Sequence, residues 1–171
     1  MLDKINRFER KWLYRSNDYL TLINSLIRSN LFFSTQHPSR RVNSIYFDNT
    51  NLSSIRQNLD GVSEKKKIRV RWYGSQNQLM NPILEIKSKK GMITNKETYK
   101  IEELEGLQFL DLKNLDLIKN VVNSKNKSKN IIEPILTTNY DRQYFVSNNS
   151  KVRATVDYNL HSINLKNLSQ M

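Results

Sequence analysis

The chain has 171 residues, which is enough for one domain with a hydrophobic core, and it contains no cysteine and only two histidines, His37 and His161. This composition excludes a disulfide framework, a cysteine nucleophile and a cysteine-rich or histidine-rich metal site. Lysine and arginine number 28 against 16 acidic residues, a formal charge of +12, so an anionic partner is expected. The sequence has no run of about 18 apolar residues that could span a membrane. We therefore expect a single cytoplasmic domain, residues 1–171, that reaches the cytoplasmic face of a membrane only through partners.

The first part of the chain predicts a strand, a helix and a loop. Residues 5–14 alternate in a way that is typical of a strand, with a charged face made of Arg7, Glu9 and Lys11. Ser16, Asn17 and Asp18 offer N-caps for a helix that runs to about Ser29. Pro38 favours a loop over residues 31–39.

The middle of the chain predicts antiparallel strands. A strand over 42–48 is followed by a turn and a short helix that end at Asp60 and Gly61. The stretch KKKIRVRWYG, residues 65–74, alternates apolar and basic side chains and predicts a strand with Lys67, Arg69 and Arg71 on one face. Strands over 82–91 and 94–101 form a hairpin at Gly91.

The last part predicts a helix, a polar loop and a second hairpin. The leucines of 104–122 favour a helix that packs on the sheet, and SKNKSKN, residues 124–130, is typical of a solvated loop. Residues 134–147 and 151–160 form the arms of a hairpin around 148–150.

Basic residues recur on one face of these strands, with arginine at positions 69, 71, 142 and 153. Such faces are equally consistent with the solvated outside of a sheet. However, the planar guanidinium suits phosphate oxygens, and the acids on these faces are too few to neutralise the cations. A concave face of this kind would hold an anion, because burying unpaired charge is expensive. Most aromatic residues are predicted on the opposite face, which argues against single-stranded nucleic acid as a partner.

Several segments, in order, resemble the VTC (vacuolar transporter chaperone) domain, the polyphosphate polymerase branch of the CYTH or triphosphate tunnel metalloenzyme superfamily. The matching segments are RFERKWLY (7–14), VNSIYFDN (42–49), LDG with KIRVRWYG (59–74), PILEIKSKKG with NKE (82–97), and NYDRQYFVS with VRATVDYNL (139–160). The resemblance implies an α+β fold in which antiparallel strands form a tunnel barrel with helices packed outside. It also implies transfer of the γ-phosphate of ATP to a polyphosphate chain, assisted by Mn²⁺ or Mg²⁺.

The resemblance also assigns roles to individual residues. It implies that the phosphate ligands are Lys11, Arg69, Arg71, Lys87, Lys96, Arg142 and Arg153, of which Arg69, Arg71, Lys87, Arg142 and Arg153 act in catalysis. Glu9 and Glu85 are the acids that would orient these cations or approach the metal. No GxxxxGK[ST] loop is present in the sequence, which excludes a P-loop mechanism.

Two departures from the family pattern limit this assignment. The superfamily often has E-x-E-x-K on its first strand, whereas here Arg7 replaces the first acid, which weakens a hydrolase or cyclase assignment. In the family a further E-x-K strand follows the segment matching 152–160 and carries the principal metal glutamate; this sequence reaches Met171 without one. We therefore expect a C-terminally truncated domain that lacks the last strand or strands, and the alternative is a natural short form with an open tunnel and poor metal binding. The partners expected are ATP, triphosphate and polyphosphate, and the open alternatives are a tripolyphosphatase and a non-catalytic binding module.

Overall fold

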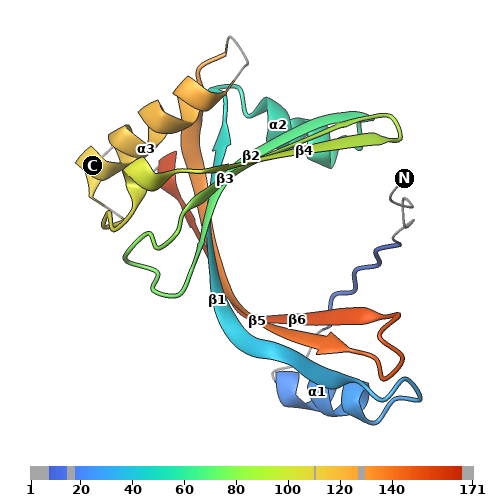
Figure 1. Ribbon diagram of the computed structural model, residues 1–171. Coiled ribbons are helices and arrows are strands. Elements are labelled where there is room, and N and C mark those ends of the chain that lie inside the picture. Colours follow the sequence, from blue (N-terminus) through green and yellow to red (C-terminus); the bar gives the residue numbers. More distant parts are fainter. Residues whose placement is uncertain (1–7, 15–17, 110, 127–129, 167–171) are drawn as a thin grey trace, which may run out of the picture.

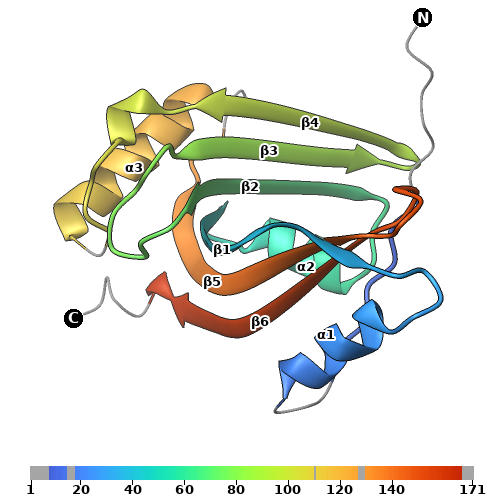
Figure 2. The same ribbon diagram turned by 60° about the horizontal axis from the view of Figure 1, so that its bottom comes forward.

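The computed structural model describes residues 8–14, 18–109, 111–126 and 130–166. These residues form a six-stranded antiparallel sheet with the spatial order β4-β3-β2-β1-β5-β6, and the sheet does not close. Its strands are β1 (Ser34–Asp48), β2 (Glu64–Tyr73), β3 (Ile83–Lys90), β4 (Ile93–Lys100), β5 (Glu133–Val146) and β6 (Arg153–Asn164). Figure 2 shows them side by side in this order. The fold is therefore the predicted α+β class, with an open antiparallel sheet consistent with a tunnel-like barrel.

The sheet bends into a C, and the helices lie outside it (Figure 1). α3 (Leu112–Lys125) covers the arm built from β2, β3 and β4, whereas α1 (Tyr19–Ile27) lies against the arm built from β5 and β6. α2 (Ser53–Leu59) and a short 3₁₀ helix, η1 (Glu102–Leu104), complete the described helices. None of the helices in these ranges combines the length and the apolar character needed to cross a bilayer.

The larger core lies between α3 and the outer face of the sheet. Trp72, Val70 and Leu84 are buried on that face and pack with Ile118 and Val122 of α3. Asp111 caps α3 by accepting a hydrogen bond from the backbone N–H of Lys113 at 3.0 Å. Alternate residues of a strand point to opposite sides of a sheet. The residues of β2 that lie between Ile68, Val70 and Trp72 therefore face the inside of the C.

A smaller core fixes α1 to the other arm. Ile23 of α1 packs with Phe33, Phe145 and Val156, and the rings of Tyr19 and Tyr158 stack with their centroids 4.0 Å apart. Asp18 caps the helix as the sequence predicts, accepting from Leu20 N at 2.9 Å. Both cores thus use the outer face, which leaves the inner face to polar residues.

Three predicted elements are wrong. Residues 8–14 of the expected first strand form no strand; Phe8 and Trp12 are 94% and 80% exposed, so no neighbour covers the apolar face that Arg10 also interrupts. The rest of that prediction, residues 5–7, lies outside the described residues.

The other two errors come from local backbone features. Residues 34–39 belong to β1 rather than to a loop, because the register shift between His37 and Arg40 accommodates Pro38 as a bulge. The expected helix over 104–122 begins only at Leu112. Gly106, at φ +77°, turns the preceding stretch so that it bonds to the backbone of Leu79.

Candidate anion-binding site

The inner face of the sheet collects the basic residues of several strands. On β2 it carries Lys67, Arg69 and Arg71, whose cross-strand partners on β3 include Lys87, opposite Lys67, and Glu85, opposite Arg69. Lys87 in turn pairs with Lys96 of the edge strand β4. The register therefore brings five of the predicted ligand positions, Arg69, Arg71, Glu85, Lys87 and Lys96, onto adjacent strands of one arm.

One buried carboxylate organises the centre of this arm. Glu85 is only 4% exposed, and its Oε2 accepts hydrogen bonds from Arg69 at 2.7 Å. Its Oε1 accepts from Arg71 Nη2 at 2.7 Å and from Lys96 Nζ at 2.8 Å. We call these four residues the Glu85 cluster. It sets three cations against one carboxylate, so it keeps an excess of positive charge.

The charges of the Glu85 cluster are fixed at neutral pH. Burial alone would raise the pKa of Glu85. The effect of burial is outweighed by the hydrogen bond from Lys96, by the charge and hydrogen bonds of Arg69 and by the charge of Arg71. The pKa of Glu85 is therefore lowered from its ordinary value of 4.5. Burial likewise opposes the charge of Arg69, yet contact with Tyr46 and Glu85 raises the pKa of the guanidinium. The cluster thus presents rigid, permanently charged donors.

Tyrosines alternate with the arginines on the inner face. Arg69 lies over the ring of Tyr46 and donates to its hydroxyl at 3.2 Å, and Arg71 lies 5.3 Å from the centre of the Tyr73 ring. The expectation that most aromatics lie opposite the arginines is therefore wrong for this face, because Tyr73, like Tyr46, shares the arginines' register. Trp72, in contrast, is buried in the core on the outer face.

The other arm holds Arg142 and Arg153. Arg142 of β5 makes a bidentate pair with Asp157 of β6, with both N–O distances at 2.6 Å, and it lies over the ring of Tyr140. The hydrogen bonds that Arg142 donates to Asp157 raise the pKa of its guanidinium. Asp157 therefore acts as a partner of an arginine. Arg153 begins β6 and is exposed, away from the Glu85 cluster.

Sequence reasoning misses one arginine and assigns no role to one lysine of the inner face. Arg40 of β1 lies directly opposite Arg142, with its guanidinium carbon 5.8 Å from the ring of Tyr73 and 5.9 Å from that of Tyr144. The loop predicted from Pro38 hides it, although its two-residue spacing from Val42 is that of a strand face. Lys67 lies on the predicted basic face but is not among the assigned ligands.

The two predicted metal residues, Glu9 and Glu85, both pair with cations in the described part of the chain. Glu9 lies on the exposed N-terminal stretch and pairs with Lys11 at 3.4 Å, whereas both oxygens of Glu85 are held by cations. No three His, Asp or Glu residues gather anywhere in residues 8–14, 18–109, 111–126 and 130–166. Mg²⁺ and Mn²⁺ are commonly held by one or two carboxylates together with phosphate oxygens and water, so the metal role of Glu9 and Glu85 stays a prediction.

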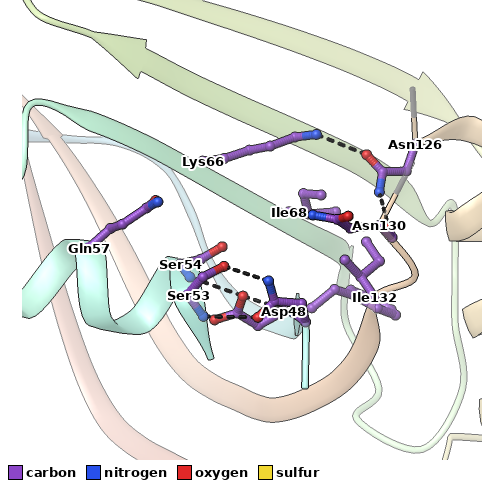
Figure 3. A pocket seen from close by; sticks show the side chains of 11 residues that line it. Asp48, Ser53, Ser54, Gln57, Lys66, Ile68, Asn126, Asn130 and Ile132 are labelled. Carbon is purple, nitrogen blue, oxygen red and sulfur yellow. Dashed lines mark hydrogen bonds between the residues drawn. The ribbon is translucent and has the colours of Figure 1, made fainter. Parts of the chain in front are cut away.

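A pocket of about 170 Å³ lies on the outer side of the sheet, between α2, β2 and the segment after α3 (Figure 3). Its polar groups are used in holding these elements together. Asp48 accepts from the backbone N–H groups of Ser54 and Ile55, both at 3.0 Å, and Lys66 donates to Asn126 at 2.9 Å. With one lysine already bonded, this pocket lacks the charge of the inner face.

Comparison with known protein families identifies the family of the chain. The profile of the VTC domain matches residues 6–170, nearly the whole chain. The chain belongs to the VTC domain family. Membership of this family suggests a function related to polyphosphate. The basic inner face of the chain has the positive charge that such a ligand requires. A search of curated proteins found no match to the chain.

Proposed function

We propose that this VTC domain is a polyphosphate polymerase that binds phosphate chains on its inner face and extends them with the γ-phosphate of ATP. The observation that supports this most is the Glu85 cluster, in which one buried carboxylate fixes three cations on rigid neighbouring strands. Arg69 and Arg71 would grip phosphate oxygens, because the planar guanidinium matches them with several donors. The Arg71 side chain is still 19% exposed while its Nη2 donates to Glu85, so part of the guanidinium remains accessible on the inner face.

The proposed reaction requires positioning and charge rather than covalent chemistry from the protein. A terminal oxygen of the acceptor chain attacks the γ-phosphorus of ATP, the bond to the β–γ bridging oxygen breaks, and ADP leaves. Negative charge spreads over the transferred group in the transition state, and fixed cations stabilise it. Arg69, Arg71, Lys87, Arg142 and Arg153 are the proposed cations, and their strands supply the rigidity that alignment demands.

A non-catalytic polyphosphate-binding module is the second candidate. The specific observation in its favour is that both oxygens of Glu85 are held by cations and that the described residues include no group of three His, Asp or Glu that could hold a divalent metal. Phosphoryl transfer usually uses such a metal to neutralise the phosphate oxygens. Binding, by contrast, needs only the excess of positive charge.

Isothermal titration of the purified chain with tripolyphosphate, with and without Mn²⁺, tests the binding site. The wild type should bind, and the Arg69→Ala/Arg71→Ala variant should bind at least about a hundredfold more weakly, roughly tenfold for each lost charged hydrogen bond. The matched control is Arg28→Ala/Lys113→Ala, which removes the same charge from exposed positions on the helix side. Failure of a folded wild-type chain to bind would contradict the proposal.

Product analysis with labelled ATP then separates the functions. Long labelled chains together with ADP support the polymerase, whereas phosphate released from tripolyphosphate indicates a tripolyphosphatase. Binding without turnover indicates the binding module. A single-stranded oligonucleotide serves as competitor, and displacement of tripolyphosphate by the oligonucleotide would contradict selectivity for phosphate chains.

A further inference from the structure

At its two ends the inner face carries Lys67, Lys87, Arg40 and Arg142, which do not belong to the Glu85 cluster. At one end Lys67 pairs across the strands with Lys87, and Lys87 pairs with Lys96. At the other end Arg40 of β1 pairs with Arg142 of β5. Like charges placed directly opposite each other destabilise a sheet, so both ends cost stability unless an anion lies between the side chains.

Neither end is neutralised within the part of the chain that the structure describes. Lys67, Lys87 and Arg40 form no ion pair with an acid there, and at the Arg40 end the carboxylate of Asp157 is occupied by both donors of Arg142. Partial burial lowers the pKa of Lys67, and so do the charges of Lys11, Lys65, Lys87 and Arg69. The cations at the Lys67 end therefore lie close enough to act on one another.

The two ends are far apart along the sheet. On β2, Tyr73 lies six residues after Lys67. Tyr73 pairs with Val42 of β1, and Arg40 lies two residues beyond Val42, so the two ends are eight residues apart along the strands. Eight residues of antiparallel strand extend about 27 Å. The Glu85 cluster lies between the ends, because Arg69 and Arg71 follow Lys67 along β2. A triphosphate held by the cluster is too short to reach both ends, whereas a longer chain can.

We propose that Lys67 and Arg40 bind the parts of a linear polyphosphate that extend beyond the triphosphate held at the Glu85 cluster, so that the domain binds long chains more tightly than short ones. This rests on the proposed function, since it deepens the same site. The two residues set the preference for chain length, and the Glu85 cluster sets affinity for the phosphate group itself. Tyr73 and Tyr144 orient Arg40 by holding its guanidinium between their rings.

The test compares tripolyphosphate with a linear polyphosphate long enough to span the face, at one fixed ionic strength. Binding to each ligand is titrated for the wild type, Lys67→Gln, Arg40→Gln and the control Lys113→Gln, an exposed lysine on α3 that undergoes the same charge change as Lys67. Each of the first two variants should lose roughly tenfold in affinity for the long chain, the effect of one charged hydrogen bond. Their affinity for tripolyphosphate, and both affinities of the control, should change less than about twofold.

The outcomes distinguish this inference from the proposed function. If the folded wild type binds neither ligand, both fail. If the wild type binds both but Lys67→Gln and Arg40→Gln leave the ratio of the two affinities unchanged, the length preference is overturned and the proposed function stands. Equal weakening by Lys113→Gln would overturn it too, because the effect would then be general charge attraction. Melting temperatures of all variants confirm that each remains folded.

Discussion

At the scale of single residues, Glu85 determines the chemistry of the inner face. A carboxylate that is 4% exposed and bonded to three cations is stable only while all of them remain paired. The sequence shows Glu85 within an E-x-K pattern but not how many cations it holds. That number depends on Arg71 and Lys96, which lie 14 and 11 residues away along the chain and meet only through the register of the strands. We therefore describe Glu85 as the residue that positions the phosphate-binding cations.

Replacing Glu85 by Gln should lower the free energy of unfolding by about 3 kcal/mol, because the variant leaves buried cations without a carboxylate. Tripolyphosphate should then stabilise Glu85→Gln more than it stabilises the wild type, since the phosphate replaces the lost charge. Urea unfolding with and without ligand measures both effects. Glu64→Gln is the matched control, because Glu64 is 60% exposed in its pair with Lys90 and should change stability far less. A variant as stable as the wild type would contradict this role.

The lowered pKa of Glu85 predicts how stability depends on pH. The unfolded chain takes up a proton at Glu85 more readily than the folded chain does. The contribution of the Glu85 charge to the free energy of unfolding is therefore complete above the ordinary pKa of 4.5. It is lost as pH falls through the lower pKa of the folded state. The difference in unfolding free energy between the wild type and Glu85→Gln should be constant from neutral pH to about 4.5 and shrink below it. A difference that persists unchanged at pH 3 would show that charge is not the cause.

At the scale of elements, the strands with strict alternation were predictable and the irregular segments were not. β2, β3 and β4 follow the predicted ranges closely. On β2 and β3 one apolar face packs into the core, and this face fixes both the element and its orientation. The N-terminal stretch alternates except at Arg10, and residues 8–14 find no partner strand, which no local pattern can reveal. The bulge at Pro38 and the turn at Gly106 likewise depend on tertiary hydrogen bonds.

The site was predictable to the same extent as the strands. Arg69, Arg71, Glu85 and Lys96 meet as a cluster because period-two patterning places them on one face and the β3–β4 hairpin fixes their register. Arg40 escaped because it lies between the loop predicted over 31–39 and the strand predicted over 42–48, whereas β1 continues through a bulge there. The contacts of Tyr46 and Tyr73 with the arginines escaped because they depend on which side of the sheet each ring faces and, for Tyr46, on the register between β1 and β2.

The docking of α3 should matter for stability and not for anion binding. Ile118 is fully buried against the outer face, so Ile118→Ala should lower the free energy of unfolding by about 2 to 4 kcal/mol. The neighbouring Leu117 is 41% exposed, and Leu117→Ala provides the control, with a much smaller loss. Chemical denaturation measures stability, and titration with tripolyphosphate below the unfolding transition should give the same affinity for both variants. Weaker binding by folded Ile118→Ala alone would mean that α3 tunes the inner face.

At the scale of the whole molecule, the charge of +12 is distributed unevenly over a bent, open sheet. The helices lie outside the bent sheet (Figure 1) and cover its outer face with two apolar cores. The register of the strands places the basic side chains of both arms on the inner face. A concentration of one sign of charge on a concave face strengthens attraction for polyanions at a distance as well as in contact.

Salt should therefore weaken polyphosphate binding strongly. Between 0.1 M and 1 M salt the screening length falls from about 10 Å to about 3 Å, and the affinity should fall more than about tenfold. The Arg69→Ala/Arg71→Ala variant should show a shallower dependence, because fewer cations take part. Titrations across this range measure the slope, and thermal melts in the same buffers check that the fold survives. An affinity independent of salt would contradict an electrostatic site.

The two tryptophans give the molecule a pair of optical probes in opposite surroundings. Trp12 is 80% exposed on the N-terminal stretch, whereas Trp72 is 1% exposed and donates from its ring nitrogen to Ser75 at 2.8 Å. A soluble quencher such as iodide should reach the red-shifted emission of Trp12 and spare the blue-shifted emission of Trp72. Fluorescence can therefore follow the N-terminal stretch and the core separately, without any added label, while phosphate chains are titrated into the same sample.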